Sequence, residues 1–552
     1  MSKNIAKTLV YSLLILCNLI LVPNHAAGNA LGLANQKIDD MNVPIARTST
    51  SGNKWFVSET GAGTDCSRIN PGPLQYCVET KAQSGDTVYV QEGHYDTDDP
   101  DDNLLFIQKS LHLIGSCNWS NTGPISCTPQ NAFIHTNSSY LNGEKERRVI
   151  AIVGSNINVT IENFIIHQGN ADGKQPKPLS VLGAGGGIYA SELDSFVLKN
   201  NYIWSNKASD TDMSSDRSLG GGVYADNVQY LDIRDNIIIF NSASARTSRG
   251  YGGGMYVYSC GDDGNVNIVS NRFQKNKVGD TTTSSSGAGA YLLHVNNLSL
   301  DDNIFEYHNA IWQDWIDGSA LVLSGDVTAN SIDHNLFYKN YGNTIAEFLG
   351  LTGDFTRNTF WDNEAFYDLW IKHENEMKIM NNFFGKTFGR ASTSSDELKG
   401  TRGGISTIIY LVTGCGNPVV DIINNTFALA EYGVQVDKYA YVDIKRNIFT
   451  MHTHKAIDVI NTIDPNVFVD ENLFWGNADN GEVGSTYWEA DPKLVDLWNG
   501  DFHIQTGSAA IDKVHVGLVD TDIDYQHRPI GLGIDLGADE YGFSFFLPLF
   551  TR

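Results

Sequence analysis

The sequence predicts an all-β protein, namely a single-stranded, right-handed parallel β-helix of about 11–14 coils that carries a short N-terminal capping helix and a C-terminal cap module. Three observations predict this fold class. An asparagine recurs at short intervals, an apolar residue follows it two positions later, and the residues before it alternate between apolar and polar.

The recurring asparagine marks one repeat after another between residues 163 and 472. Its shortest interval is 22 residues, from Asn425 to Asn447, which is too short for a strand, a crossover helix and two turns. Each repeat therefore fits one coil of three short strands and three turns. The repeated asparagines are Asn163, Asn201, Asn236, Asn271, Asn303, Asn335, Asn358, Asn382, Asn425, Asn447 and Asn472.

Equivalent residues of neighbouring coils stack roughly 4.8 Å apart in such a fold. We expect the apolar column to fill the interior, and the asparagines to lie at a turn, where Asn tolerates the left-handed conformation and its amide bonds the coils above and below. Both sets are therefore interpreted as scaffold. The apolar column is Ile165, Ile203, Ile238, Phe273, Phe305, Phe337, Phe360, Phe384, Phe427, Phe449 and Phe474, and a second asparagine column is Asn206, Asn241, Asn276, Asn340, Asn363 and Asn477.

The N-terminus has the features of a secretory signal peptide: Lys3 and Lys7, an apolar stretch over residues 9–22, and small residues near Ala26. Further on, Pro73 precedes apolar residues at helical spacing, which predicts the short capping helix. The expected organisation is a signal peptide over residues 1–27, a flexible leader over 28–53, an N-terminal cap with the first coils over 54–150, the β-helix repeats over 151–489, a C-terminal module over 490–541 and a hydrophobic tail over 542–552.

The charge balance excludes some partners. The chain has 38 Lys and Arg against 64 Asp and Glu, a net charge of −26. Nucleic acids and anionic lipids bind clustered cations, so neither is expected as a partner. No later apolar run is long enough for a transmembrane helix, and we expect a secreted or cell-surface monomer.

Six cysteines remain after the signal peptide, in an oxidising compartment. Cys66 with Cys77, and Cys117 with Cys127, are close in sequence and are predicted disulfides. Cys260 and Cys415 follow equivalent strands about five coils apart, hence roughly 24 Å. That separation exceeds the reach of a disulfide, so these two are not expected to bond to each other.

Loops of variable length precede the glycine-rich strand of several coils and should line one edge of the rod. The tyrosines that follow them, Tyr189, Tyr224, Tyr256 and Tyr291, form a column beside this edge and are candidate ligand-binding residues. Trp312 and Trp315 are spaced like residues that stack on a sugar, although core packing is the alternative.

One of these loops carries Asp210, Asp212 and Asp216 close to Arg217. A polysaccharide lyase needs an acidic Ca²⁺ site beside a cationic base, and a glycosidase needs paired carboxylates. The four residues are therefore candidate catalytic residues. The alternative is a solvated acidic loop, because the glycine and distal Glu of a defined calcium loop are missing.

Together these features resemble the pectin-lyase-like, right-handed β-helix superfamily. Residues 490–541, with GSAAID, DTDID, Arg528-Pro529 and GADEY in order, resemble the terminal module of secreted bacterial proteins of the choice-of-anchor Q type. The resemblance covers most of residues 54–541. It implies export and surface placement without a common activity.

Asp520, Asp522 and Asp524 alternate in DTDID, so their side chains converge on Ca²⁺ if the stretch curves as a loop. The alternative is that these aspartates, together with Arg528 and Asp535, form a set of ion pairs that closes the open end of the helix. No other cofactor is expected.

Two functions remain open at this stage. The first is a non-catalytic protein whose loop-lined edge binds extracellular polysaccharide, a cell-surface glycan or another surface. The alternative is a polysaccharide-degrading enzyme, a lyase or glycoside hydrolase that acts in a groove along the helix, with Ca²⁺ as its candidate cofactor. The first is favoured, because it needs only a rigid rod and variable loops, whereas no complete catalytic set can be assembled from the sequence.

Overall fold

The computed structural model describes most of the chain from residue 52 onward. The predicted signal peptide and most of the leader lie outside the described residues, as does most of the hydrophobic tail. The described ranges are 52–97, 103–132, 137–171, 183–209, 217–243, 249–262, 264–279, 285–309, 318–389, 406–412, 417–437, 440–460 and 466–542.

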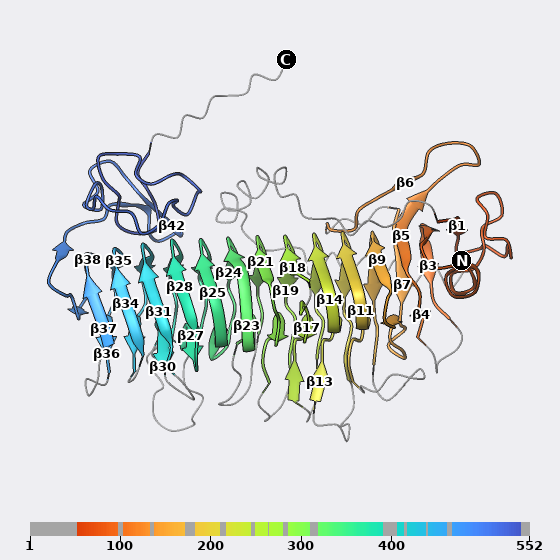
Figure 1. Cartoon of the computed structure of the whole chain (residues 1–552), viewed down its shortest axis with the longest axis horizontal. Helices are drawn as coiled ribbons and strands as arrows, with labels where there is room; N and C mark the ends of the chain where they lie inside the picture. The colour runs from red at the N-terminus through yellow and green to blue at the C-terminus, as the bar shows by residue number, and fades with distance from the viewer. Residues whose placement is uncertain are drawn as a thin grey trace, which may run out of the picture.

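The chain is a right-handed parallel β-helix, an elongated rod in which each coil adds strands to the same sheets (Figure 1). One sheet of 14 parallel strands takes one short strand from each coil. Its strands are β3 (Gly93–Tyr95), β7 (Ser139–Asn142), β10 (Phe164–His167), β12 (Tyr202–Trp204), β15 (Ile237–Ile239), β19 (Arg272–Gln274), β22 (Ile304–Glu306), β24 (Leu336–Tyr338), β26 (Thr359–Trp361), β29 (Phe383–Gly385), β32 (Thr426–Ala428), β35 (Ile448–Thr450), β38 (Asn472–Trp475) and β40 (Tyr487–Glu489).

A second sheet of 24 strands covers the rest of the coil. Long strands such as β11 and β25 run through two strand positions of their coil and so join two sets of parallel strands into one sheet. The strands are β1 (Lys54–Val57), β2 (Asp86–Gln91), β4 (Leu105–Ile107), β5 (Leu111–Asn118), β6 (Ser126–Cys127), β8 (Ile150–Val153), β9 (Asn158–Glu162), β11 (Ile188–Lys199), β14 (Val223–Arg234), β17 (Met255–Tyr258), β18 (Val266–Val269), β20 (Ala290–Leu293), β21 (Leu298–Asp301), β23 (Leu321–Asp333), β25 (Thr344–Thr356), β27 (Tyr367–Lys372), β28 (Glu376–Met380), β30 (Thr407–Val412), β31 (Val419–Ile423), β33 (Tyr432–Val436), β34 (Tyr441–Lys445), β36 (Lys455–Val459), β37 (Asn466–Asp470) and β39 (Asp479–Gly481).

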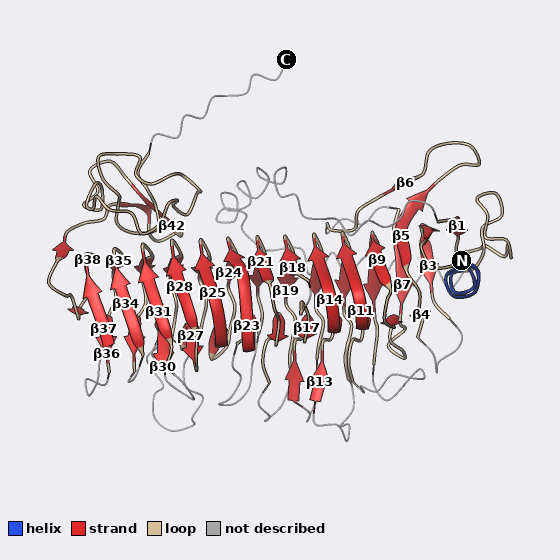
Figure 2. Cartoon of the chain, in the orientation of Figure 1, coloured by secondary structure: helices blue, strands red, loops and turns tan. Residues whose placement is uncertain are grey.

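Smaller elements complete the fold. The strands β13 (Arg217–Leu219) and β16 (Arg249–Tyr251) pair in parallel, and β41 (Leu494–Asp496) pairs antiparallel with β42 (Asp501–Ile504). A single helix, η1 (Tyr76–Lys81), lies at the N-terminal end of the rod among the described residues, as Figure 2 shows. It buries Val78 against the first coils, which agrees with the predicted capping helix.

The phenylalanine column fills the interior, as predicted. Every member from Phe273 to Phe474 is fully buried, and consecutive ring centroids lie 4.3 Å (Phe337 to Phe360) to 5.5 Å (Phe449 to Phe474) apart. These separations match the spacing of adjacent strands, so each coil contributes one ring to a continuous stack. Offset stacking adds to the gain from burial.

The first asparagine column forms a continuous hydrogen-bonded ladder from Asn201 to Asn472, with the backbone N–H of Asn201 donating to Oδ1 of Asn236 and the pattern repeating in each coil. The sequence-based assignment of the left-handed conformation was wrong by one residue. The residue before each ladder asparagine has the positive φ, for example Asp235 at 55° and Ser270 at 56°. That turn leaves the asparagine free to point both its N–H and its amide along the stack.

The first repeat is also shifted by one position from the sequence alignment. Ile166, not Ile165, is in register with Ile203, and Asn163 occupies the left-handed position with φ 67°. Phe164 therefore takes the ladder position, and its N–H donates to Oδ1 of Asn201 at 3.0 Å. Three apolar residues in a row, Phe164 to Ile166, made the spacing ambiguous.

The C-terminal module, residues 490–542, packs against the side of the rod. Phe502 is fully buried against Trp361 and Phe383, on the outer face of the 14-stranded sheet. The expectation that ion pairs in this module close the open end of the helix is therefore wrong. Arg528 does form a buried ion pair, but with Glu540 at 2.9 Å inside the module.

Both predicted disulfides, Cys66–Cys77 and Cys117–Cys127, are present. Cys260 is a buried free thiol, and Cys415 lies outside the described residues. Burial raises the pKa of the Cys260 thiol to about 12. Among the described residues, no helix is long and apolar enough to cross a membrane.

Candidate functional site

The inserts that precede the glycine-rich strands define one edge of the rod, which we call the insert edge, and several of the residues singled out from the sequence belong to these inserts or follow them in the chain. Asp210, Asp212 and Asp216 lie outside the described residues, as do Trp312 and Trp315. Arg217 is exposed at the start of β13. Because the three aspartates are not among the described residues, the structure does not test whether this loop is catalytic, and that assignment stays a prediction.

The tyrosine column beside the insert edge is a stack of rings. Tyr189, Tyr224 and Tyr256 are 3 to 6% exposed, and their centroids lie 5.0 and 5.7 Å apart. Burial raises the pKa of the Tyr189 phenol. The ring faces stack on one another, and Tyr291, the least buried member, offers the part of this column that a ligand can still reach.

The opposite edge of the rod is formed by the turns before the ladder asparagines, and we call it the turn edge. It runs along the top of the rod in Figure 1, whereas β13 lies at the bottom. One left-handed residue per coil lines it. These residues, the turn column, are Asn200, Asp235, Ser270, Asp302, His334, Arg357, Asn381, Asn424, Arg446 and Glu471.

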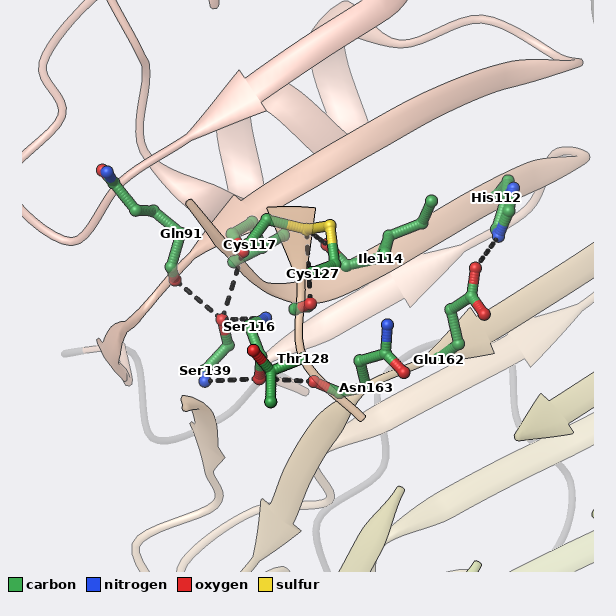
Figure 3. Close-up of a disulfide and its surroundings, with 12 residues drawn as sticks. Gln91, His112, Ile114, Ser116, Cys117, Cys127, Thr128, Ser139, Glu162 and Asn163 are labelled. Carbon is green, nitrogen blue, oxygen red and sulfur yellow. Dashed lines mark hydrogen bonds and ion pairs between the residues drawn. A yellow bond between two sulfur atoms is a disulfide. The ribbon is translucent and has the colours of Figure 1, made fainter. Parts of the chain in front are cut away.

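An N-terminal arm, residues 116–132, covers the first position of the turn column. It leaves the coil at β5, returns as β6 and is tied by the Cys117–Cys127 disulfide (Figure 3). The arm's Gln130 N–H donates to the carbonyl of Asn200 at 2.9 Å, and the Asn131 amide donates to Oδ1 of Asn200 at 3.2 Å. The arm thus projects from the rod beside the next coil.

The C-terminal module covers four later positions of the same column, Arg357, Asn381, Asn424 and Arg446. Arg357 donates to Oγ1 of Thr521 at 3.1 Å, and its guanidinium lies 4.3 Å from the centroid of the Tyr525 ring. The other three side chains donate to backbone carbonyls of the module, for example Asn424 to Asp535 at 3.0 Å.

Three positions between the arm and the module, Asp235, Ser270 and Asp302, remain open. Among the described residues, neither the arm nor the module forms a hydrogen bond or ion pair with them. His334, the next position, contacts Tyr525 of the module at 5.9 Å between centroids. Five coil steps separate Asn200 from Arg357, about 24 Å at the spacing of parallel strands.

A cavity of about 270 Å³ lies at the arm end of this open stretch. Its lining combines an amide, a carboxylate, a hydroxyl, a guanidinium and an aliphatic side chain. Burial raises the pKa of the Asp235 carboxyl, and Arg272 pairs with Glu306 at 2.5 Å. The lining residues are Asn131, Ala132, Asp235, Asn236, Ile237, Ser270 and Arg272.

A pair of carboxylates lies at the module end of the open stretch. Asp301 and Asp333 are direct neighbours in the register of β21 and β23. Burial raises the pKa of Asp301 to about 6, with Asp333 adding repulsion, although the Ser331 hydroxyl bonds the Asp301 carboxylate. Asp333 instead accepts hydrogen bonds from Arg357 at 2.8 Å and from the Tyr525 hydroxyl at 2.9 Å.

The aspartates predicted to bind Ca²⁺ do not converge. Asp520 is exposed, whereas Asp522 is fully buried and accepts hydrogen bonds from the backbone N–H groups of residues 524, 526 and 540. Asp522 therefore shapes the turn. Asp524 points elsewhere, toward His503 at 3.0 Å.

Sequence reasoning missed His503 and Asp539, which meet Asp524 in the module. One ligand-type atom from each of these three residues lies within 4.8 Å of the other two. Asp501 and His503 alternate along β42 and so face the same side, a signal that was present in the sequence. Asp539 lies in the GADEY motif, whose buried carboxylate has no sequence signal of its own.

A comparison with models of known protein families supports the fold. A family model described as "Right handed beta helix region" matches residues 108–292. The crystal structure of pectate lyase Pel9A is similar at 10% identity and a TM-score of 0.29, with 90% of this chain and 98% of that chain covered. No curated protein matches the chain.

Proposed function

We propose that this chain is an exported β-helix protein that binds an extended, uncharged glycan along the turn edge, between the N-terminal arm and the C-terminal module, without cleaving it. One observation carries the proposal: a repeated turn position is covered at Asn200 and from Arg357 to Arg446, and is open in the coils between. A rod with two projecting segments and an open stretch between them suits a linear polymer.

The chemistry of the open stretch supports a sugar ligand. Asp235 and Asn131 offer hydrogen-bond acceptors and donors, Arg272 offers donors, and Ile237 offers an apolar surface. Binding sites combine a few placed polar groups with apolar contacts in this way. The net charge of −26 disfavours acidic polymers, so a neutral polysaccharide is favoured.

Export is part of the proposal. Two disulfides among the described residues are consistent with an oxidising compartment, and the predicted signal peptide supplies the route. The choice-of-anchor Q resemblance supports placement at the cell surface. We propose a monomer, because the arm and the module of one chain already border the open stretch.

The test compares two edges of one protein. Binding of the purified chain to a panel of neutral and acidic polysaccharides is measured by calorimetry, together with the variants Asp235→Asn and Arg272→Gln. Asn keeps the left-handed turn at position 235. We expect each variant to weaken binding of a neutral glycan about tenfold, the loss of one charge-assisted hydrogen bond.

Arg249→Gln on the insert edge is the matched control, since Arg249 is exposed at the start of β16. Unchanged binding by this variant supports the turn edge. Loss of binding only in Arg249→Gln would transfer the site to the insert edge, and no binding by the unaltered chain to any polysaccharide would overturn the proposal.

The carboxylate pair favours a second candidate function, a glycoside hydrolase. Neighbouring coils hold Asp301 and Asp333 about 4.8 Å apart in backbone spacing, close to the roughly 5–5.5 Å between the carboxyl groups of retaining enzymes. The pKa of Asp301, raised to about 6, suits a general acid, while Asp333, which accepts hydrogen bonds from Arg357 and Tyr525, is the candidate nucleophile.

Low exposure places this function second, because both carboxylates are only 9% exposed. New reducing ends released from the bound polysaccharide, and lost in Asp301→Asn and in Asp333→Asn, would establish hydrolysis. Asp326→Asn, at an exposed position within β23, is the control. Binding without any release supports the non-catalytic function.

A further inference from the structure

We infer that the C-terminal module contains a binding site for a zinc-like divalent metal ion, with His503, Asp524 and Asp539 as ligands and Asp501 as the residue that positions the imidazole. This site is independent of the turn-edge function. It shares Asp524 with the Ca²⁺ site expected from the sequence but differs from that site in its other two ligands and in metal class.

Three separate segments bring the ligands together. His503 comes from β42, Asp524 from the turn at residues 520–527, and Asp539 from the final segment of the module. One ligand atom from each lies within 4.8 Å of the others. Ligand atoms at about 2.0–2.2 Å from a tetrahedral ion lie roughly 3.4 Å apart, so the widest of these separations must close by at most about 1.4 Å when a metal binds.

The imidazole of His503 is held in the orientation that a metal ligand requires. Nδ1 contacts Oδ1 of Asp501 at 2.6 Å, so Nε2 faces Asp524 at 3.0 Å. A carboxylate on the far nitrogen of a ligating histidine fixes the tautomer and ring orientation, an arrangement common in zinc sites. Phe383 packs edge-on against the ring at 5.4 Å and limits its rotation.

Asp539 supplies an independent reason to expect a cation. The residue is 5% exposed, and among the described residues only one of its two carboxylate oxygens accepts a hydrogen bond, from the N–H of Ile504 at 2.7 Å. Burying a carboxylate is costly unless a cation or a hydrogen-bond donor meets it. The neighbouring groups that share this site with Asp539 are the imidazole of His503 and the carboxylate of Asp524.

The donor set selects the class of metal. One imidazole nitrogen with two carboxylates suits Zn²⁺ and similar transition-metal ions, whereas Ca²⁺ takes oxygen ligands only. His503 and Asp524 retain side-chain exposures of 34% and 27%, so water can reach the set and complete the coordination. Nε2 gives up its proton when the metal binds.

The experiment uses the purified full chain without an affinity tag, stripped with a chelator and titrated with ZnCl₂, MnCl₂ or CaCl₂ by calorimetry, with the melting temperature measured in parallel. We expect saturable binding of one Zn²⁺ or Mn²⁺ per chain and a higher melting temperature. Asp524→Asn should remove this binding, and Asp501→Asn should weaken it about 10–100-fold, as outer carboxylates of metal sites do.

Asp520→Asn is the matched control because Asp520 is exposed in the same turn. Should Asp524→Asn fail to fold, Asp539→Asn serves in its place, because Asn keeps an acceptor for the Ile504 N–H. Absence of one-to-one binding in the unaltered chain, equal binding in Asp524→Asn, or a response to Ca²⁺ alone would each overturn the site.

Discussion

Oδ1 of Asn236 accepts two hydrogen bonds from Asn201, one from the backbone N–H at 2.9 Å and one from the side-chain amide at 3.1 Å. The amide of Asn236 in turn donates to Oδ1 of Asn271 and to the carbonyls of Leu198 and Arg234. Each ladder asparagine thus satisfies buried polar groups in two neighbouring coils.

Asn303→Ala should therefore be strongly destabilising. Asn303 is fully buried, its Oδ1 accepts from Asn271, and its amide donates to Asn335. Truncation leaves buried donors and acceptors unpaired, each costing about 1–3 kcal/mol, so we expect a loss of about 3 kcal/mol or more. Chemical denaturation measures it. Asn265→Ala, at an exposed position, should change the free energy of unfolding by less than about 0.5 kcal/mol. Equal losses in the two variants would contradict a stabilising role of the asparagine ladder.

Phe337→Ala tests the interior column. The Phe337 ring is fully buried, and its centroid lies 5.1 Å from that of Phe305 and 4.3 Å from that of Phe360. Removing a buried Phe ring costs about 3–5 kcal/mol through lost burial and the cavity that remains. Phe468→Ala, which removes a ring that is 68% exposed, should cost far less. Similar losses of unfolding free energy in both variants would mean that the interior phenylalanine column stabilises the fold no more than an exposed ring does.

The two columns could be predicted from the sequence because a coil needs the same side chain at the same place every time, so the requirement repeats along the chain. The open stretch could not. It depends on where a non-repeating arm and a non-repeating module dock, and these contacts join residues as distant as Asp333 and Tyr525. The error of one residue at Asn163 has a local cause, since a run of apolar residues fits two registers.

The C-terminal module depends on a buried ion pair. The side chains of Arg528 and Glu540 are both 0% exposed, and Arg528 also donates to the carbonyls of Asp535 and Gly537. Breaking one partner of a buried pair costs about 3–5 kcal/mol, because the other charge remains uncompensated.

Arg528→Met should therefore loosen the module while the coils stay folded. Limited proteolysis should cut within residues 490–542 faster than in the unaltered chain, and circular dichroism of the sheets should persist. The double variant Arg528→Met with Glu540→Gln also removes the buried carboxylate charge that Arg528→Met leaves without a partner, so the module should regain part of its resistance to proteolysis. Uniform cleavage along the whole rod would instead show that the module and the coils unfold together.

His308 replaces an asparagine in the second column and makes stability depend on pH. Nδ1 of His308 accepts a hydrogen bond from the backbone N–H of Asn276 at 3.2 Å, as an asparagine oxygen does elsewhere in the column. The backbone N–H of His308 donates to Oδ1 of Asn340. Burial lowers the pKa of His308 to about 3. In the unfolded chain His308 binds a proton below about pH 6.5, whereas in the folded chain it stays neutral down to about pH 3. The free energy of unfolding therefore falls as the pH drops from about 6.5 toward 3.

His308→Asn should remove this contribution, because Asn does not titrate and matches the residue of the neighbouring coils. We expect a melting temperature that decreases less steeply between pH 6.5 and pH 4 than in the unaltered chain, by the equivalent of up to one proton. Buried His452 and His167, whose pKa values burial lowers to about 4, retain their contributions in this variant and keep a residual slope. An unchanged dependence of the melting temperature on pH would mean that His308 takes up its proton in the folded chain as easily as in the unfolded chain. That outcome would contradict the lowered pKa of the buried imidazole.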